Sequence, residues 1–286
     1  MRKLAPHAEA SREVLFRYPS LAEYISQLNI IGALPHYRGE PPKCPLPSGL
    51  PYDASRTLGM VGKLRKDVRD VGVFIIPPRC DGPTAPLIAT PTTTAQKRKP
   101  DRTLSTDFRI ISDLRYPYHF CFKSEYHEVK LTDVGKIAER AIATKRRWPN
   151  LRALYNKRDI DDAFKRVRVR PDMCAILCTE SPGEYFLIDD KDSAVIFLYL
   201  APPFGWRASP GYFPQVGEGI TLAHNGYTTN TPDRDGADFF ESQLFVDDAI
   251  FIEPELGQRP RLAISRWEHL RRRLLGESAI NEQKLD

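Results

Sequence analysis

The chain has 286 residues, of which 41% are hydrophobic and 28% are charged, and it carries a formal net charge of +5. This length and composition fit a globular protein with one large domain or two modest ones. The charge permits a nucleic-acid partner without establishing one, because the clustering of basic residues matters more than their number.

The sequence carries no signal for export or membrane insertion. No apolar stretch follows the charged N-terminus, and no apolar run approaches the roughly 18 residues that a membrane-spanning helix needs. The five cysteines form no Cys-x-x-Cys pair and no zinc spacing with the histidines. We therefore expect a soluble cytoplasmic or nuclear protein that is not secreted, has no membrane partner and keeps its thiols free.

Basic residues gather in five clusters. They are Lys63, Arg65, Lys66 and Arg69; Lys97, Arg98 and Lys99; Lys145, Arg146 and Arg147; Arg166, Arg168 and Arg170; and Arg271, Arg272 and Arg273. Clusters of this kind suit phosphate backbones. The alternative for each is a solvated helix face or loop.

The N-terminal part contains one helix pattern and two short strand patterns. Residues 20–33 predict a helix capped by Ser20, and residues 71–76 and 108–112 predict strands. The intervening residues 81–107 are rich in Pro, Thr and Lys, which predicts a loop.

From residue 132 onward, strands and helices follow one another in irregular order. The pattern predicts helices over 132–144, 161–168, 209–223 and 260–275, strands over 154–160, 174–178, 185–188 and 194–200, and a hairpin over 243–252. Thr132 is expected to cap the first of these helices. The irregular order predicts an α+β fold.

Two adjacent acidic residues, Asp247 and Asp248, lie in the middle of the predicted hairpin. The flanking residues 244–246 and 249–252 are all apolar. Two anions in a tight turn repel each other, and a bound divalent cation would remove that repulsion. The alternative is an ordinary exposed turn, which is also how we interpret the Asp pair at 189–190.

A third carboxylate, Asp159, lies near the end of the strand predicted over 154–160. If that strand neighbours the hairpin, Asp159 could meet Asp247 and Asp248. A few hard oxygen ligands suit Mg²⁺, which takes further ligands from substrate phosphates. Two such ions about 4 Å apart can activate an attacking hydroxyl and stabilise a leaving pyrophosphate, which is polymerase chemistry. We therefore expect two Mg²⁺ ions as cofactors, with Mn²⁺ as a substitute.

Four short motifs resemble those of reverse transcriptases, the RNA-directed DNA polymerases. Residues 159–164 (DIDDAF) resemble the first palm motif, D-x-x-D-A-F/Y. Residues 203–210 (PFGWRASP) resemble the second, P-F/Q-G-W/L-x-x-S-P, and residues 245–248 (FVDD) resemble the third, F/Y-x-D-D. Residues 108–115 (FRIISDLR) resemble the fingers motif R-x-x-x-D-x-R. The four occur in the family's order, and the resemblance covers roughly residues 70–286.

The resemblance implies the fingers and palm of a right-hand polymerase, with an antiparallel palm sheet that has helices packed on one face. Asp159, Asp247 and Asp248 are the implied metal ligands and catalytic residues, and the carbonyl of Ile160 would help to hold the metal. Lys284 resembles a palm lysine proposed to protonate the leaving pyrophosphate. The alternative for this lysine is a solvated surface position.

The resemblance also implies a deoxynucleotide site in the palm. The backbone N–H groups of Asp162 and Ala163 would lie under the triphosphate. The ring of Phe164 would clash with a ribose 2′-hydroxyl and so select deoxynucleotides. The alternative for Phe164 is a core aromatic side chain.

The implied fingers and second-motif residues would complete this nucleotide site. Arg109 would pack on the incoming nucleotide, and either Lys97 or Lys99 would supply a second cation to the triphosphate. Phe204 and Gly205 would flank the sugar and base, because glycine lets the backbone come close. The alternative for this pair is a simple turn.

The chain departs from the family pattern in two motifs. Phe245 stands where many relatives carry Tyr, and Tyr116-Pro117-Tyr118 follows the fingers motif in place of the common residues. The combination of this Tyr-Pro-Tyr with residues 203–206 (PFGW) resembles retrotransposons that integrate with a tyrosine recombinase (DIRS-like elements).

The expected organisation is an N-terminal extension leading into the fingers over 1–68, fingers over 69–153 and palm over 154–286. Part of the fingers is also expected between 165 and 200. The residues after Asp248 leave no room for a thumb or a ribonuclease H domain, which predicts a fragment of a retroelement polyprotein or a degraded genomic copy. The expected partners are an RNA or DNA template with its primer, dNTP, and the thumb, ribonuclease H and recombinase parts of that polyprotein.

Two other functions stay open. A palm polymerase that makes RNA would usually carry Gly-Asp-Asp and a small or acidic gate residue, so Val246 and Phe164 argue against it. A non-catalytic nucleic-acid-binding remnant would use the basic clusters without metal chemistry.

Overall fold

The structure is a computed structural model that describes residues 8–34, 54–70, 72–76, 89–90, 92–99, 101–115, 132–182, 194–206, 209–226 and 239–279. The chain forms two compact units. Unit 1 comprises Met1–Leu4, Ile31–His127 and Val167–Ser209, and unit 2 comprises Ala5–Ile30, Glu128–Arg166 and Pro210–Asp286. Each unit is therefore assembled from separate stretches, whereas the sequence-based division runs in consecutive segments apart from the exchange expected over 165–200. Helices combine with largely antiparallel sheets, which confirms the α+β class.

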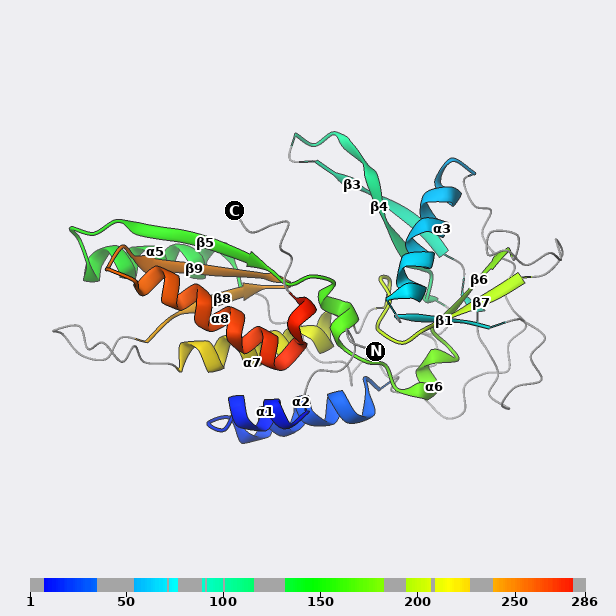
Figure 1. The fold of residues 1–286 in the computed structure, drawn as a ribbon. Coiled ribbons are helices and arrows are strands. Elements are labelled where there is room, and N and C mark those ends of the chain that lie inside the picture. Colours follow the sequence, from blue (N-terminus) through cyan, green and yellow to red (C-terminus); the bar gives the residue numbers. More distant parts are fainter. Residues whose placement is uncertain are drawn as a thin grey trace. The chain divides into compact units, whose positions relative to one another are not determined.

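Unit 1 contains a four-stranded sheet in the order β1-β7-β6-β2 and a separate β3-β4 pair (Figure 1). Its elements are α3 (Ala54–Arg69), β1 (Val73–Ile76), β2 (Ala89–Thr90), β3 (Thr92–Arg98), β4 (Leu104–Ser112), α6 (Pro171–Cys174), β6 (Cys178–Pro182) and β7 (Ala194–Tyr199). Met60 and Leu64 of α3 pack with Val73, Phe108 and Phe197 in the core of this unit. Burying such side chains contributes about 1.5–3 kcal/mol each.

Two sequence-based predictions for unit 1 are wrong. The loop expected over 81–107 contains β2, β3 and the start of β4, because its threonines are β-branched and favour an extended backbone once a partner strand is present. The strand expected over 174–178 begins only at Cys178, because Pro171 starts a short helix that ends at Cys174. The strand expected over 185–188 lies outside the described residues.

Unit 2 is built on a three-stranded antiparallel sheet in the order β5-β9-β8. Its strands are β5 (Ala153–Asp159), β8 (Ser242–Phe245) and β9 (Asp248–Pro254). Its helices are α1 (Ala8–Val14), α2 (Pro19–Ile31, whose last residue falls in unit 1), α5 (Val134–Arg147), η2 (Ala163–Arg166), α7 (Ser209–Asn225, whose first residue falls in unit 1), α8 (Arg259–Leu275) and η4 (Glu277–Ala279).

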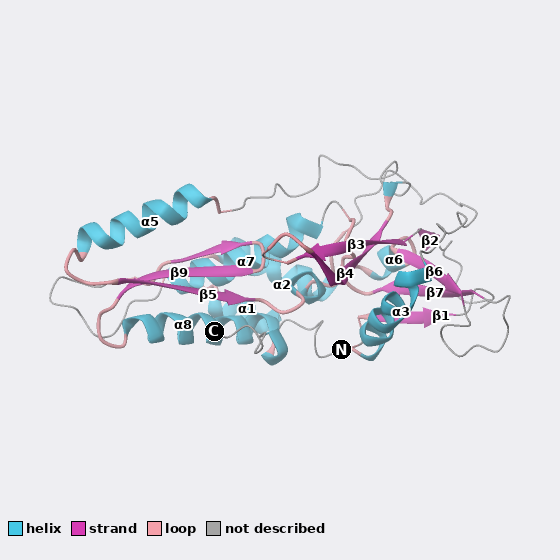
Figure 2. Ribbon diagram, turned by 90° about the horizontal axis from the view of Figure 1, so that it is seen from above, coloured by secondary structure: helices cyan, strands magenta, loops and turns pink. Residues whose placement is uncertain are grey.

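Helices lie on both faces of the unit 2 sheet (Figure 2). On one face, Phe251 packs edge-on against Trp267 of α8 at a centroid distance of 5.7 Å, and Leu244 lies against Gly217 of α7. On the other face, Gln243 donates from Nε2 to the carbonyl of Lys136 in α5 over 3.1 Å. The expectation of helices on one face only is therefore wrong. Figure 1 shows α5 along the part of the sheet away from the β8–β9 turn.

Three details of the predicted helices in unit 2 need correction. Ser20 is not a cap, because α2 begins at Pro19, where a proline suits the first helical position. The cap of α5 is Asp133, whose side chain accepts from the N–H of Lys136, and not Thr132. The helix expected over 161–168 shrinks to η2, because Asp162 has φ +50° and so interrupts an α-helical path.

Two buried polar interactions connect α8 to its neighbours, one to β9 and one to α7. Glu253 and Arg259 form an ion pair with 2.6 Å between Oε2 and Nε. Burial raises the pKa of Glu253, and Arg259 opposes that shift. His224 places Nε2 3.0 Å from the carbonyl of Ala263 and stacks on Phe240. Burial lowers the pKa of His224 to about 4, so this imidazole is neutral at pH 7.

Within the described part of the chain, no helix combines the length and the hydrophobicity needed to cross a membrane.

Candidate active site

Asp159 and Asp248 face each other at the end of the unit 2 sheet. They are partners in the register of β5 with β9, and Asp248 is also the partner of Phe245 across the β8–β9 hairpin. The strand predicted to carry Asp159 therefore neighbours the hairpin, as we expected from the sequence.

Backbone hydrogen bonds fix how closely the two acidic residues approach. Ile160 donates from its N–H to the carbonyl of Asp247 over 2.9 Å. Ile160 and Asp247 thus form a hydrogen-bonded pair. Hydrogen-bonded and non-hydrogen-bonded pairs alternate along an antiparallel ladder, so the neighbouring pair, Asp159 with Asp248, is non-hydrogen-bonded, and in such pairs the side chains lie closest. Like charges directly opposite each other destabilise a sheet, so this arrangement favours a cation between them.

The backbone conformation of the turn between β8 and β9 is unfavourable for the valine at its first position. Val246 has φ +58°, a conformation that is an outlier for a β-branched side chain. Asp247, the second residue of the turn, does not have a positive φ. A positive φ at the first loop residue only is the pattern of a type II′ turn, which normally takes glycine there. The hairpin therefore holds Asp247 and Asp248 with some backbone strain at Val246.

A lysine already neutralises part of the acidic pair. Lys157 lies two residues before Asp159 on the same face of β5, and its Nζ is 2.6 Å from Oδ2 of Asp248. The lysine side chain is 63% exposed, so a competing cation could displace it at small cost, because exposed ion pairs contribute about 0–1 kcal/mol.

Metal binding at this place stays a prediction. No group of three or more His, Cys, Asp or Glu side chains gathers as a metal site among the residues that the structure describes. Of the predicted ligands, the structure brings Asp159 and Asp248 opposite each other, while Asp247 lies in the turn just before Asp248. Carboxylates are ligands that Mg²⁺ prefers, and the resemblance implies Asp159, Asp247, Asp248 and the carbonyl of Ile160 as the residues that would hold the ions.

The residues after Asp159 turn back sharply. Asp162 accepts at its carbonyl from the N–H of Lys165 over 2.8 Å, and Ala163 is buried. Phe164 is half-buried, and its ring meets Phe213 edge-on at 5.9 Å. Packing against a fully buried ring holds Phe164 in place, while its exposed part leaves room for contact with a ligand.

Unit 1 brings together three of its predicted site residues. The guanidinium of Arg109 lies over the ring of Phe204, 5.6 Å from its centroid, and Ser112 donates its N–H to the carbonyl of Phe204 over 2.8 Å. Gly205 has φ +104°, and a Cβ there would come within 2.1 Å of the Ser112 carbonyl oxygen. Within unit 1, the close approach at Gly205 is therefore to β4, and only glycine satisfies it.

The three predicted lysines have different positions. Lys97 lies in β3, two residues from Ala95, the register partner of Arg109. Lys99 lies at the turn between β3 and β4, where its N–H donates to the carbonyl of Thr103. Lys97 is thus nearer to Arg109 along the hairpin. Lys284 lies outside the described residues.

Two members of the basic clusters are not surface residues. Arg166 is 1% exposed and Arg271 is 0% exposed, so the interpretation of these two side chains as phosphate-binding surface charges is wrong. Arg272 and Arg273 pair with Glu277 and Glu13. Arginine can be buried when its donors meet backbone carbonyls, and a run of basic letters does not reveal this.

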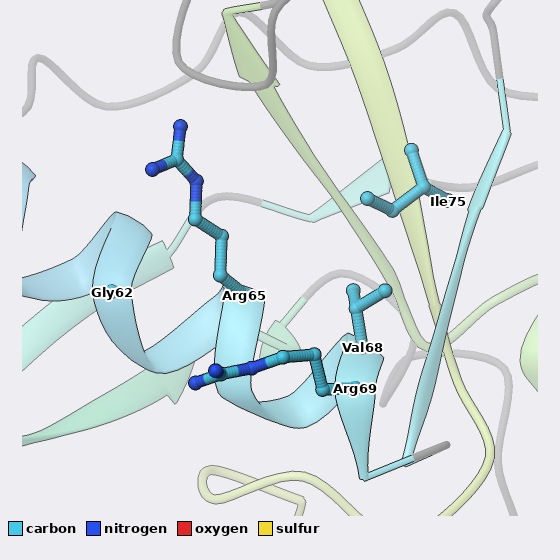
Figure 3. Close-up of a pocket in the computed structure, with 5 residues that line it drawn as sticks. All are labelled: Gly62, Arg65, Val68, Arg69 and Ile75. Carbon is cyan, nitrogen blue, oxygen red and sulfur yellow. The ribbon is translucent and has the colours of Figure 1, made fainter.

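In the basic cluster on α3, Arg65, Lys66 and Arg69 are exposed to solvent. Gly62, Arg65, Val68, Arg69 and Ile75 line a hollow of 440 Å³ beside α3 and β1. Figure 3 shows Arg65 and Arg69 extending from the helix, with Val68 and Ile75 forming an apolar part of the wall. Lys63, by contrast, turns inward to the ring and carbonyl of Phe108.

Sequence reasoning missed Lys157, Arg166 and Arg271 as neighbours of the acidic segment. The alternation along β5 could have indicated Lys157, because residues two apart on a strand share a face. No sequence signal places the two arginines, which come from η2 and α8.

A scan against models of protein families finds no match to this chain, and a search of curated proteins finds no significant relative.

Proposed function

We propose that this chain carries out template-directed DNA synthesis as the fingers and palm of a retroelement reverse transcriptase. The observation that supports this most is the pairing of Asp159 with Asp248, together with the bond from Ile160 to Asp247. These contacts place the first and third polymerase-like motifs on adjacent strands. Metal-dependent phosphoryl transfer needs carboxylates from separate segments at one place.

In this proposal, unit 2 is the palm and unit 1 the fingers. The residues of the first and third motifs all belong to unit 2, whereas Arg109, Phe204 and Gly205 belong to unit 1. The first and third motifs in unit 2 support the palm assignment, and Arg109 of the fingers motif supports unit 1 as the fingers. The second palm-like motif does not follow this division, because Phe204 and Gly205 lie in unit 1 although the palm was expected over 154–286.

The reaction would be in-line attack of a primer 3′-hydroxyl on the α-phosphate of a dNTP. Two Mg²⁺ ions, when bound, supply Lewis-acid stabilisation of the attacking and leaving oxygens. The protein residues act by positioning: Asp159, Asp247 and Asp248 hold the negative charge that defines the site. Lys157 balances Asp248 before substrate binds. Catalysis of this kind is largely orientation and electrostatics.

Each unit carries proposed nucleotide contacts of its own, Phe164 in unit 2 and Arg109 and Lys97 in unit 1. Phe164, held by Phe213, would exclude a ribose 2′-hydroxyl. Arg109, stacked on Phe204, would pack on the incoming nucleotide, and the position of Lys97 in β3 favours it over Lys99 as the second triphosphate cation.

The decisive experiment is incorporation of labelled dNTP on a primed RNA or DNA template with Mg²⁺ or Mn²⁺. Asp247→Asn is expected to lower incorporation by about 10²- to 10³-fold, by analogy with the loss of a principal electrostatic group. The matched control is Asp172→Asn, which removes an exposed carboxylate paired with Arg170 in unit 1 and should leave incorporation unchanged.

Other outcomes would identify the alternatives. Preference for rNTP over dNTP would indicate an RNA-synthesising palm polymerase. Salt-dependent binding of template by the folded protein, with no incorporation of either nucleotide, would indicate a non-catalytic nucleic-acid-binding protein. If Asp247→Asn retains full incorporation, the proposed role of Asp247 is wrong.

A further inference from the structure

Two buried arginines lie directly behind the segment that carries Asp159. Arg271 comes from α8 and Arg166 from η2, both in unit 2, and both are almost completely buried. Each donates to a backbone carbonyl of the segment that leads out of β5, and Arg166 also has a terminal nitrogen 3.7 Å from Oδ2 of Asp161.

Arg271 satisfies a backbone group that the sheet leaves open. β5 is an edge strand, and at the non-hydrogen-bonded pair with Asp248 the carbonyl of Asp159 points away from β9. An unpaired buried carbonyl is costly. Nη1 of Arg271 donates to this oxygen over 3.1 Å, so the guanidinium fixes the backbone of the predicted metal ligand itself.

The short helix η4 (Glu277–Ala279), called the strap below, completes the arrangement around Asp161. The carbonyl of Ala279 in η4 accepts from the N–H of Asp161 over 3.0 Å and from Arg271 over 3.4 Å. Nε of Arg166 donates to the carbonyl of Asp161 over 3.0 Å, and its two terminal nitrogens bond to Oγ and the carbonyl of Ser278. Asp159 and Asp161 are therefore held through their main chain by two guanidinium groups and the strap.

Burial of these two charged side chains lowers the stability of the folded state. Burial is the main cause that lowers the pKa of Arg166 and takes that of Arg271 to about 10. The nearby charges of Arg272, Arg166 and Arg158 lower the pKa of Arg271 further, while Glu268 raises it. Nε and Nη2 of Arg271 have no hydrogen-bond partner. Replacement of buried charges by well-packed apolar residues is often neutral or stabilising, so stability alone does not explain arginine here.

We infer that Arg271 is a positioning residue for the acidic site: it locks the main chain of Asp159 so that this carboxylate stays opposite Asp248, and Arg166 does the same for Asp161 through the strap. The inference rests on the proposed function for its catalytic consequence, whereas the locking of the main chain can be measured without it.

The test compares Arg271→Met, which keeps the length of the side chain, with Arg261→Met as the matched control on the same helix, where the arginine is exposed. For Arg271→Met we expect kcat for dNTP incorporation to fall roughly 10- to 100-fold, the scale of a misplaced catalytic group. KM for dNTP should change much less. Arg271→Lys restores charge without the planar fork and should recover only part of kcat.

Amide hydrogen exchange separates the inference from the proposed function. Exchange at Ile160 and Asp161 should be faster in Arg271→Met than in the wild type and unchanged in Arg261→Met, even if no variant incorporates dNTP. A wild type without incorporation would overturn the proposed function while the exchange result still decides the locking. Unchanged exchange and unchanged kcat in Arg271→Met would overturn the inference. If Arg271→Met does not fold, the same two readouts on Arg271→Lys decide it.

Discussion

Asp159 on β5 and Asp248 on β9 stand opposite each other, and Lys157 supplies the cation nearest to Asp248 that the structure describes. The pair places two like charges at the closest cross-strand spacing. A divalent cation bound there would remove the repulsion and would bind the folded state only.

Mg²⁺ is accordingly expected to raise the melting temperature of the wild type. At a concentration about 100 times its Kd, a ligand specific to the folded state stabilises by about 2.7 kcal/mol. Asp159→Asn should lose this shift, whereas the exposed Asp172→Asn should keep it. NaCl at matched ionic strength controls for simple screening. Equal Mg²⁺ shifts in Asp159→Asn and the wild type would exclude Asp159 as a ligand.

Val246→Gly is expected to stabilise the protein. Val246 has φ +58°, and a left-handed conformation costs a residue with a side chain about 1–2 kcal/mol, while glycine loses about 0.5–1 kcal/mol in unfolded-chain entropy. The net gain should be up to about 1 kcal/mol by urea unfolding. Val246→Ala keeps a Cβ and should gain little. A loss of stability in Val246→Gly would mean that the valine side chain contributes more by contact than its backbone costs.

Arg259→Ala is expected to destabilise unit 2 strongly. Arg259 is the ion-pair partner of the buried Glu253, and leaving one charge of a buried pair uncompensated costs about 3–5 kcal/mol. The matched control is Arg152→Ala, whose arginine is 78% exposed and pairs with Glu255 at 3.6 Å. An exposed pair contributes only about 0–1 kcal/mol. Denaturant unfolding measures both, and similar losses in the two variants would contradict the role given to burial.

Stability should fall in acid because of His224. Burial lowers the pKa of His224 from 6.5 to about 4, so below the unfolded value the unfolded state binds the proton first. The stability from neutral His224 is complete above pH 6.5 and is lost as the pH falls toward about 4, at up to about 1.4 kcal/mol per pH unit.

His224→Gln provides the comparison for this pH dependence. Glutamine can donate to the carbonyl of Ala263 but does not titrate, so the difference in unfolding free energy between wild type and variant should shrink with acidification. Other groups, including Glu253 with its raised pKa, contribute equally to both proteins. A difference that is independent of pH would show that His224 does not titrate in this range.

Much of the secondary structure of unit 2 follows from local patterns. The apolar runs around Asp247-Asp248 predict the hairpin, and α7 and α8 appear within a few residues of their expected bounds. The predictions that were wrong also have physical causes. Thr-rich β3 needs a partner strand to become extended, and the helix after Asp161 is cut short by the positive φ of Asp162. Neither the partner nor the dihedral angle is visible in local periodicity.

Short sequence patterns are enough to identify the side chains of the candidate site and their order along the chain. Motif residues such as Asp159, Asp247 and Phe164 can be named from short patterns, because these patterns constrain residue type and spacing. Only the tertiary structure decided that Asp159 pairs with Asp248 and that Arg271 holds the carbonyl of Asp159 from behind. The reason is that register and burial depend on contacts between segments far apart in the chain. The sequence does not distinguish a basic residue whose charge is solvated from one whose charge bonds to a buried carbonyl.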